Sequence, residues 1–172
     1  MLDISYAEAM TVNLDNQNPH IAGFLKRNHV AVLATASKDS SEPHAAAVYF
    51  DTDSNLNVYF LTKEKTLKCK NLMSNPQAAM AVYESDTQRT AQINGPVEVV
   101  DDKEGMAIAQ RIMAKFSQQG AGSEETPISK LDAGDYVLFR LRPQSIRLAE
   151  YRYGEHNSLF DVAVPSEESL EN

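Results

Sequence analysis

HVAVLATASKDSSEPHAAAVYFDTDSNLNVYFLT, from His29 to Thr62, contains three apolar runs separated by two polar turns. The runs cover residues 29–37, 44–50 and 56–62, and the turns between them are rich in Ser, Asp, Asn and Pro. Two strand-like runs joined by a short polar turn indicate a β-hairpin. The stretch therefore predicts three consecutive antiparallel strands. The first run is apolar at successive positions, which predicts a strand buried on both faces.

The same patterns extend along the rest of the chain. Further strands are predicted at 78–84, 90–100, 135–142 and 144–152, with Gly95-Pro96 indicating a bulge or an edge position in the second of them. Helices are predicted at 18–28, from Thr66 to Pro76, and at 101–120. Three apolar helix faces are predicted, formed by Ile21, Phe24 and Leu25, by Cys69, Leu72 and Met73, and by Ala109, Ile112, Met113 and Phe116. About seven mostly antiparallel strands with three inserted helices predict a small closed or partly open barrel of the α+β class, with Greek-key connections.

Length and composition restrict the possible functions. The chain has 172 residues, a length that suits one domain with a full core. Its formal net charge of -8 argues against a dedicated nucleic-acid binder. Cys69 is the single cysteine, and the four histidines show no metal-ligand spacing, so neither a disulfide within the chain nor a metal site is expected. We see no signal peptide and no membrane span, and we therefore expect a cytoplasmic protein.

The domain organisation follows from these patterns. We expect an irregular N-terminal arm over residues 1–15, one folded domain over residues 16–155 and an acidic, flexible tail over residues 156–172.

Positive charge gathers just after the third strand. Four of the nine lysines, Lys63, Lys65, Lys68 and Lys70, fall within eight residues of this acidic chain. Such a run is most often a solvated helix face. However, the predicted helix start at Thr66 presents free N–H groups beside the Thr62 and Thr66 hydroxyls and the lysine ammonium groups. Those are the groups that a phosphate monoester needs, so the segment is a candidate anion site.

Two other patterns have both a structural and a functional interpretation. The triplet Ala45-Ala46-Ala47 leaves room against a strand either for a closely packed helix or for a flat ligand. Four of the seven arginines, Arg140, Arg142, Arg147 and Arg152, lie on the last two predicted strands, where plain surface positions explain them equally well.

Taken together, EPHAAAVYF, LNVYFLT, TLK, NPQAAMAVYE and QINGPVEVVDD resemble, in order and spacing, the pyridoxamine-phosphate-oxidase-like family of flavin-binding split barrels. The resemblance covers roughly residues 20–152. It implies a split barrel and a homodimer with FMN at the subunit interface.

The resemblance also implies roles for individual residues. Leu61 and Thr62 match positions on the phosphate side of the flavin, and Thr66, Leu67 and Lys68 match a Ser-Arg-Lys phosphate motif, with Lys63 and Lys65 beside them. On the ring side, Ala46, Ala47 and Val48 match the strand that runs along the isoalloxazine. Thr90 or Gln92 matches a polar residue that reaches the ring. Arg147 and Tyr151 match positions in a late R-L-H-x-R motif.

Several positions depart from the family pattern. Leu67 replaces the phosphate-binding arginine, so Lys63, Lys65 and Lys68 would have to supply that charge. Ala149 stands where the oxidase has its substrate-binding histidine, and Tyr151 where it has an arginine. We therefore expect an FMN-binding protein, acting as an oxidoreductase on a small molecule, that is not a true pyridoxamine-phosphate oxidase.

Two alternatives remain on the same barrel. Relatives that bind deazaflavin or haem suggest another cofactor, and a haem-binding or haem-degrading protein would use His44 or His156 as axial ligand. The other alternative is a cofactor-free, stress-related interaction module.

Overall fold

The computed structural model describes residues 19–101, 103–119, 136–150 and 158–163. These residues form three helices and eight strands. The first half of the chain contains α1 (Pro19–Arg27), β1 (Val30–Ala36), β2 (Pro43–Thr52), β3 (Val58–Lys63), α2 (Leu67–Ser74) and β4 (Gln77–Glu84). The second half contains β5 (Arg89–Val99), α3 (Lys103–Gln119), β6 (Tyr136–Leu141), β7 (Ser145–Glu150) and β8 (Ser158–Ala163).

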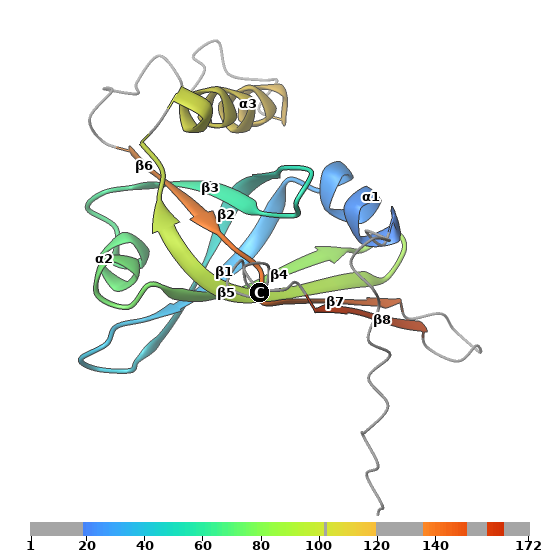
Figure 1. Cartoon of the computed structure of the whole chain (residues 1–172), viewed down its shortest axis with the longest axis horizontal. Coiled ribbons are helices and arrows are strands. Elements are labelled where there is room, and N and C mark those ends of the chain that lie inside the picture. The colour runs from blue at the N-terminus through green and yellow to red at the C-terminus, as the bar shows by residue number, and fades with distance from the viewer. Residues whose placement is uncertain (1–18, 102, 120–135, 151–157, 164–172) are drawn as a thin grey trace, which may run out of the picture.

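The strands form an antiparallel barrel with a two-stranded extension (Figure 1). Neighbouring strands follow the order β4-β1-β2-β3-β6-β5, and a further pairing between β4 and β5 closes the ring. β6 comes late in the chain but lies between β3 and β5. β7 and β8 continue the sheet outward from β5. The predicted α+β antiparallel split barrel is confirmed.

β8 was not identified from the sequence. It lies within residues 156–172, which the sequence assigned to a flexible tail, and it pairs with β7 in register from Ser145–Ala163 to Glu150–Ser158. The sequence signal is weak because SLFDVA is short and lies in an acidic stretch. The rest of the predicted tail and the predicted N-terminal arm lie outside the described residues.

β5 changes partner at Gly95-Pro96. It pairs with β7 up to Asn94 and with β6 from Val97 onward. Proline cannot donate to a ladder, and here it stands between the two ladders. A Cβ on Gly95 would lie 2.0 Å from the carbonyl oxygen of Arg142, so only glycine allows this close approach. The predicted irregularity is therefore a change of strand partner.

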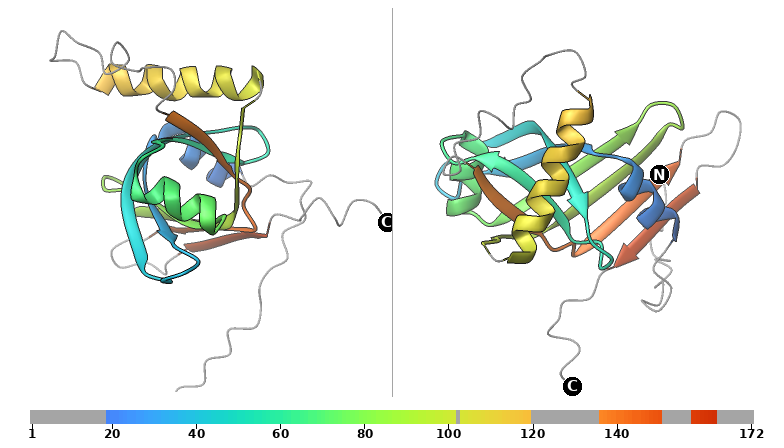
Figure 2. Two further views of the ribbon diagram at one scale, coloured as in Figure 1. Left: turned by 90° about the vertical axis from the view of Figure 1, so that its left-hand side faces the viewer. Right: turned by 90° about the horizontal axis from the view of Figure 1, so that it is seen from above.

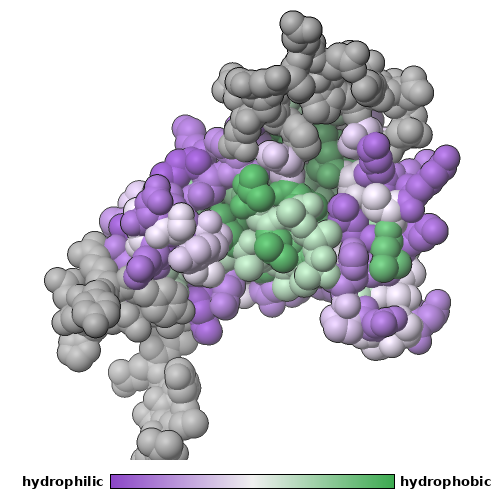
Figure 3. Space-filling model, turned by 180° about the vertical axis from the view of Figure 1, so that it is seen from behind, coloured by the Kyte–Doolittle hydropathy of each residue, from purple (hydrophilic) through white to green (hydrophobic). Residues whose placement is uncertain are grey.

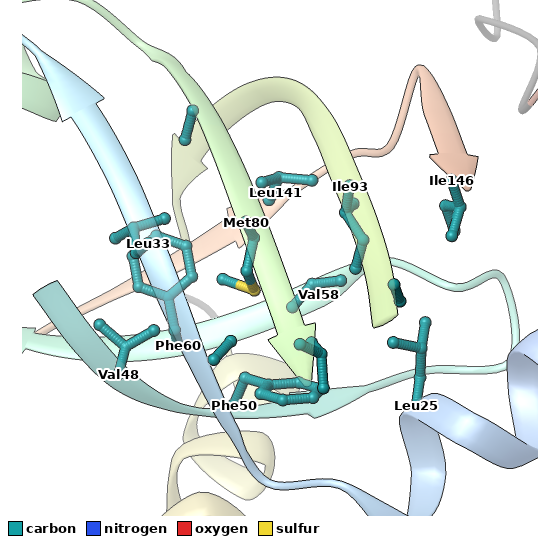
Figure 4. Packing of buried hydrophobic residues seen from close by; sticks show 14 of the residues in the cluster. Leu25, Leu33, Val48, Phe50, Val58, Phe60, Met80, Ile93, Leu141 and Ile146 are labelled. Atoms are coloured by element: carbon teal, nitrogen blue, oxygen red, sulfur yellow. The ribbon is translucent and has the colours of Figure 1, made fainter. Parts of the chain in front are cut away.

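The core lies inside the barrel. Inward side chains from the six barrel strands meet there, among them Leu33, Phe50, Phe60, Met80, Ile93 and Phe139, and several of these are labelled in Figure 4. The rings of Phe60 and Phe139 stack with their centroids 5.6 Å apart. α1 adds the predicted face of Ile21, Phe24 and Leu25, all buried. α1 and α2 lie at opposite ends of the barrel (Figures 1 and 2).

α3 covers part of the outer surface of the barrel (Figure 2). Ile108 and Ile112 of α3 pack against Tyr59 of β3 and Leu138 of β6, and all four are buried. Asp51 at the end of β2 accepts hydrogen bonds from Arg111 (2.8 Å) and Lys115 (2.7 Å). Burial by itself would raise the pKa of the Asp51 carboxyl, but these two bonds and a third from the Thr52 N–H outweigh it and hold that pKa below its usual range. Apolar packing and a nearly buried carboxylate thus fix α3 to the barrel.

Within the described residues, no helix is long and apolar enough to cross a membrane.

Candidate functional site

A second part of the outer barrel surface is apolar and lies open to solvent; we call it the open face. It consists of twelve outward side chains on five neighbouring strands, and all twelve are exposed. Its apolar members are Val30, Val32 and Ala34 of β1, Ala45 and Ala47 of β2, and Ala79, Ala81 and Tyr83 of β4. Its polar members are Gln92 and Asn94 of β5 and Ser145 and Arg147 of β7. Figure 3 shows an apolar surface in the middle of the molecule with hydrophilic residues on both sides.

The strand register brings these side chains into rows. Val32 lies between Ala47 on β2 and Ala81 on β4, and Ala81 lies beside Gln92, which in turn pairs with Arg147. One row across the sheet therefore runs from small apolar side chains to an amide and a guanidinium. A shallow depression of about 620 Å³ lies along this surface over β1, β4, β5 and β7.

The open face corrects the prediction that the first strand is buried on both faces. Along β1, exposed and buried positions alternate, with Val32 half exposed (49 %) and Leu33 fully buried. The side chains of Ala45 and Ala47 are also exposed, so no described helix covers these two alanines. The alternative of a closely packed helix therefore does not apply to Ala45 and Ala47 among the described residues. Val48 of the predicted ring-side strand turns into the core instead, while Ala46 is half-buried.

The basic segment contains the start of α2. Thr66 caps the helix, accepting a hydrogen bond from the Cys69 N–H to its Oγ1 (3.4 Å). As in any helix, the first backbone N–H groups, here those of Leu67 and Lys68, have no partner within the helix. The predicted helix start is confirmed at this residue.

The two threonine hydroxyls use their protons within the protein. Thr66 Oγ1 donates to the Lys63 carbonyl (2.8 Å) and lies 2.9 Å from Thr62 Oγ1. Because the Thr66 proton is already engaged, Thr62 must be the donor in the contact between the two hydroxyls. Thr62 is also buried, at 3 % exposure. Both hydroxyls therefore fix the helix start, and the free donors at this point are backbone N–H groups and lysines.

The lysines surround this helix start. Lys63 and Lys65 are exposed and Lys68 is half-buried. The Lys63 ammonium lies 5.8 Å from the centre of the Tyr136 ring, which restricts its position. Behind the lysines, burial raises the pKa of the Cys69 thiol, so Cys69 stays protonated at neutral pH and acts as a packing residue.

One expectation about α2 is wrong. Met73 is 59 % exposed, and Asn71 takes the buried place beside Leu72. The Asn71 amide donates to Thr35 Oγ1 of β1 (3.2 Å), which makes a buried polar side chain tolerable. Leu67, which the resemblance aligns with a phosphate-binding arginine, is 55 % exposed at the first position of the helix.

The other predicted site residues occupy several places. Leu61 packs against the cluster under α3, and half-buried Thr90 lies next to Ala149 in the sheet. Arg140 and Arg142 share the carboxylate of Glu98 on β5, so this part of the arginine cluster is structural. Tyr151, Arg152 and His156 lie outside the described residues.

The structure therefore divides the predicted site into two groups. Ala47, Gln92 and Arg147 belong to the open face, while Thr62, Lys63, Lys65, Thr66 and Lys68 gather at the start of α2. The contribution of β1 and β4 to the open face was not predicted from the sequence. The alternation of small apolar residues in VAVLA and AAMAVY was a possible signal, because both strands keep apolar side chains on their outward face.

No group of three or more potential metal ligands occurs among the described residues. Half-buried His44 lines a groove between α2 and the β1–β2 turn.

Residues 17–149 match the sequence model of the family described as pyridoxamine 5'-phosphate oxidase. No curated protein matches the chain. Among solved structures, the chain is similar to a pyridoxamine 5'-phosphate oxidase-related, FMN-binding protein from Nostoc punctiforme. The two share 18 % identity at a TM-score of 0.56, over 84 % of this chain and 96 % of that chain.

Two further solved structures share the fold. A protein named F420 reductase is 28 % identical, with a TM-score of 0.58 over 72 % of this chain and 93 % of that chain. A haem-binding protein from Mycobacterium smegmatis is 17 % identical, with a TM-score of 0.57 over 79 % of this chain and 53 % of that chain. The three proteins share the barrel and differ in the cofactors that their names give.

Proposed function

The chain belongs to the pyridoxamine 5'-phosphate oxidase family, and on that basis we propose that it binds FMN at the interface of a homodimer and acts as a flavin-dependent oxidoreductase on a small molecule. The observation that carries the proposal is the open face. A soluble monomer rarely leaves a contiguous apolar surface uncovered. Here the uncovered residues are mostly alanine and valine, which form a flat floor rather than a deep pocket.

The phosphate group fits the donors at the start of α2. A phosphate monoester is close to a dianion at neutral pH, and the helix dipole and unpaired N–H groups favour negative charge at this end of a helix. Lys63, Lys65 and Lys68 supply three cations there, against the single carboxylate of Glu64. Each charge-assisted hydrogen bond contributes about 1.5–3 kcal/mol. The lysines thereby offset the missing arginine at Leu67.

The isoalloxazine ring fits the open face. Small side chains at Ala47, Val32 and Ala81 allow a flat ring to approach the strands closely. Gln92 offers both a donor and an acceptor, and Arg147 offers a cation, so the polar edge of the ring would lie toward β5 and β7. Bound FMN would supply the redox chemistry, while these residues bind and orient it.

A second copy of the chain is the proposed cover of the open face. A ring lying on one exposed sheet would remain open to water on its other side. A two-fold symmetric partner would bury the ring and the apolar residues together, and such isologous interfaces are the commonest in homodimers. Exclusion of water from the ring would also strengthen the interactions made by Gln92 and Arg147.

Deazaflavin and haem are the other cofactors to be considered. The 28 % identity to a protein named F420 reductase is the observation that supports deazaflavin as an alternative. The deazaflavin ring has the same flat shape and would use the same face. Haem would need an axial ligand, and His44 is the described histidine that lines a groove.

The test is the absorption spectrum of the purified full chain, together with the mass of any cofactor that it releases on denaturation. We expect a flavin spectrum and the mass of FMN. A Soret band would support haem, and the mass of a deazaflavin would support that cofactor. A colourless protein that takes up none of the three would contradict the proposal and favour a cofactor-free interaction module.

A further inference from the structure

A groove of about 520 Å³ lies beside the proposed phosphate site. One wall is a face of α2 with Leu67, Lys70 and Ser74, which are spaced by three and four residues and so point the same way. The other wall is the β1–β2 turn and the start of β2, with Asp39, Glu42 and His44.

The groove begins at the phosphate end of α2 and runs toward the other end of the helix. Leu67 is the first residue of α2 and also lines the groove. Ser74, the last residue of α2, lies at the turn, because its Oγ accepts from the Lys38 N–H (3.4 Å). A cofactor group attached beyond the phosphate would therefore have a direct way into the groove.

Electrostatic potential becomes less favourable to anions along this path. The start of α2 has Lys63, Lys65 and Lys68, whereas the carboxylates of Asp39 and Glu42 face a single lysine in the groove, Lys70. The C-terminal end of a helix carries the negative end of its dipole, which adds to the effect. The side chain of Lys38 belongs to the same turn but does not line the groove.

We infer that Asp39 and Glu42 select a flavin that ends at its phosphate, FMN, against a flavin extended by a second anionic group, as in FAD. This inference rests on the proposed function. Size alone does not exclude the longer cofactor, because pockets of about 300–1,000 Å³ hold ligands of that kind. The selection is electrostatic: a second phosphate in the groove would face two carboxylates and one ammonium group. The same charges would act against any cofactor that carries further anionic groups beyond the phosphate.

The experiment measures the dissociation constants of FMN and FAD by flavin fluorescence for the full chain, and the quantity compared is their ratio, FAD over FMN. Asp39→Asn/Glu42→Gln should lower this ratio at least about three-fold, since each carboxylate at such a distance changes the affinity of an anion by a factor of about two. Lys70→Ala should raise the ratio. The change produced by the double variant should shrink in about 0.5 M salt, because exposed charges are then screened.

Asp86→Asn is the matched control, because Asp86 is an exposed aspartate in the β4–β5 turn. It should leave the ratio unchanged. FMN affinity itself shows that the double variant and the control are folded, since removal of a carboxylate should not weaken FMN binding. An unchanged ratio in Asp39→Asn/Glu42→Gln, or a wild-type chain that binds FAD as tightly as FMN, would overturn the inference while leaving the proposed function intact. A wild-type chain that binds neither flavin would overturn both.

Discussion

The barrel has two apolar outer surfaces, of which one is covered by α3 and the other by no described helix. Under α3, the outward side chains are large: Tyr59 and Leu138 are buried against Ile108 and Ile112, with Tyr49 and Leu61 beside them. On the open face, most of the apolar side chains are alanine or valine and no described helix covers them. Large side chains interlock with a helix of the same chain, whereas small ones leave a flat surface for a ring and a second copy. We therefore expect changes under α3 to act on folding and changes on the open face to act on assembly and cofactor binding.

The largest effect should come from a charge placed on the open face. Val32→Arg puts a cation in the middle of the proposed interface, where it would be desolvated without a partner. We expect the dimer to weaken by about three powers of ten or more, with flavin affinity lost in parallel. The free energy of unfolding of the monomer should change little, because Val32 is half exposed. Sedimentation analysis and chemical denaturation measure the two quantities, and a variant that remains dimeric would remove Val32 from the interface.

Pyridoxamine phosphate should be a poor substrate. Ala149 is buried at 9 % exposure and supplies neither charge nor a side-chain hydrogen bond where the oxidase has a histidine. Each missing charged hydrogen bond costs about 1.5–3 kcal/mol, so the loss here and at Tyr151 should lower kcat/KM by about two to four powers of ten. The assay follows pyridoxal phosphate formation by the FMN-loaded chain under oxygen. Turnover comparable to that of a dedicated oxidase would show that the substrate site lies elsewhere.

Under α3 the comparison predicts a folding defect. Ile112→Ala removes a fully packed side chain and should lower the free energy of unfolding by about 2–4 kcal/mol. Ala109→Gly at the margin of the same cluster serves as a smaller change, with a cost of about 1 kcal/mol from helix propensity. Denaturation of both variants is to be compared with that of Val32→Ala. If Val32→Ala were as destabilising as Ile112→Ala in the monomer, the two surfaces would not differ as described.

At the start of α2, Lys68→Ala should weaken FMN binding by about 1.5–3 kcal/mol, or roughly ten- to a hundred-fold. Lys26→Ala is the matched control, because Lys26 is an exposed lysine on α1 at the opposite end of the barrel. A fluorescence titration of the two variants decides the matter. Equal affinities would place the phosphate away from Lys68.

The smallest expected change in the free energy of unfolding comes from removal of the ion pair between Arg27 and Glu84, which lies away from both surfaces. A hydrogen bond from Arg27, with others from Thr87 and Asn28, lowers the pKa of Glu84 to about 2. A carboxylate with a lowered pKa stabilises the fold above its unfolded pKa of about 4.3, and this contribution disappears as the pH falls toward 2. Because the Arg27 side chain is 43 % exposed, we expect Arg27→Ala to cost only about 1 kcal/mol at neutral pH. The difference between variant and wild type should shrink below about pH 4 in denaturation curves.

The barrel could be predicted from the sequence because short turns rich in Asp, Ser and Asn join β1 to β2 and β2 to β3. The cap at Thr66 was also accessible, since a threonine before an apolar helical pattern is a local signal. The open face was not accessible in the same way. A strand such as VAVLA looks alike whether its second face is covered by its own chain or by another copy, so β1 was predicted as fully buried.

Two details depended on the three-dimensional structure. The use of the Thr62 and Thr66 protons follows from distances between side chains, which no spacing in the sequence gives. The exchange of Met73 for Asn71 on the inner side of α2 follows from the position of Thr35, which lies 36 residues away in the chain. The buried hydrogen bond from Asn71 to Thr35 on β1 therefore outweighs the apolar pattern of the helix.

The central claim is that the open face is a cofactor-binding interface between two copies of the chain. The most direct test is light scattering of the FMN-loaded full chain at micromolar concentration, with flavin absorbance recorded across the same peak. The account predicts a single species of twice the chain mass of 19.0 kDa, with the flavin in that peak. A species of 19.0 kDa that still carries flavin would contradict it, because the open face would then bind its cofactor without a partner.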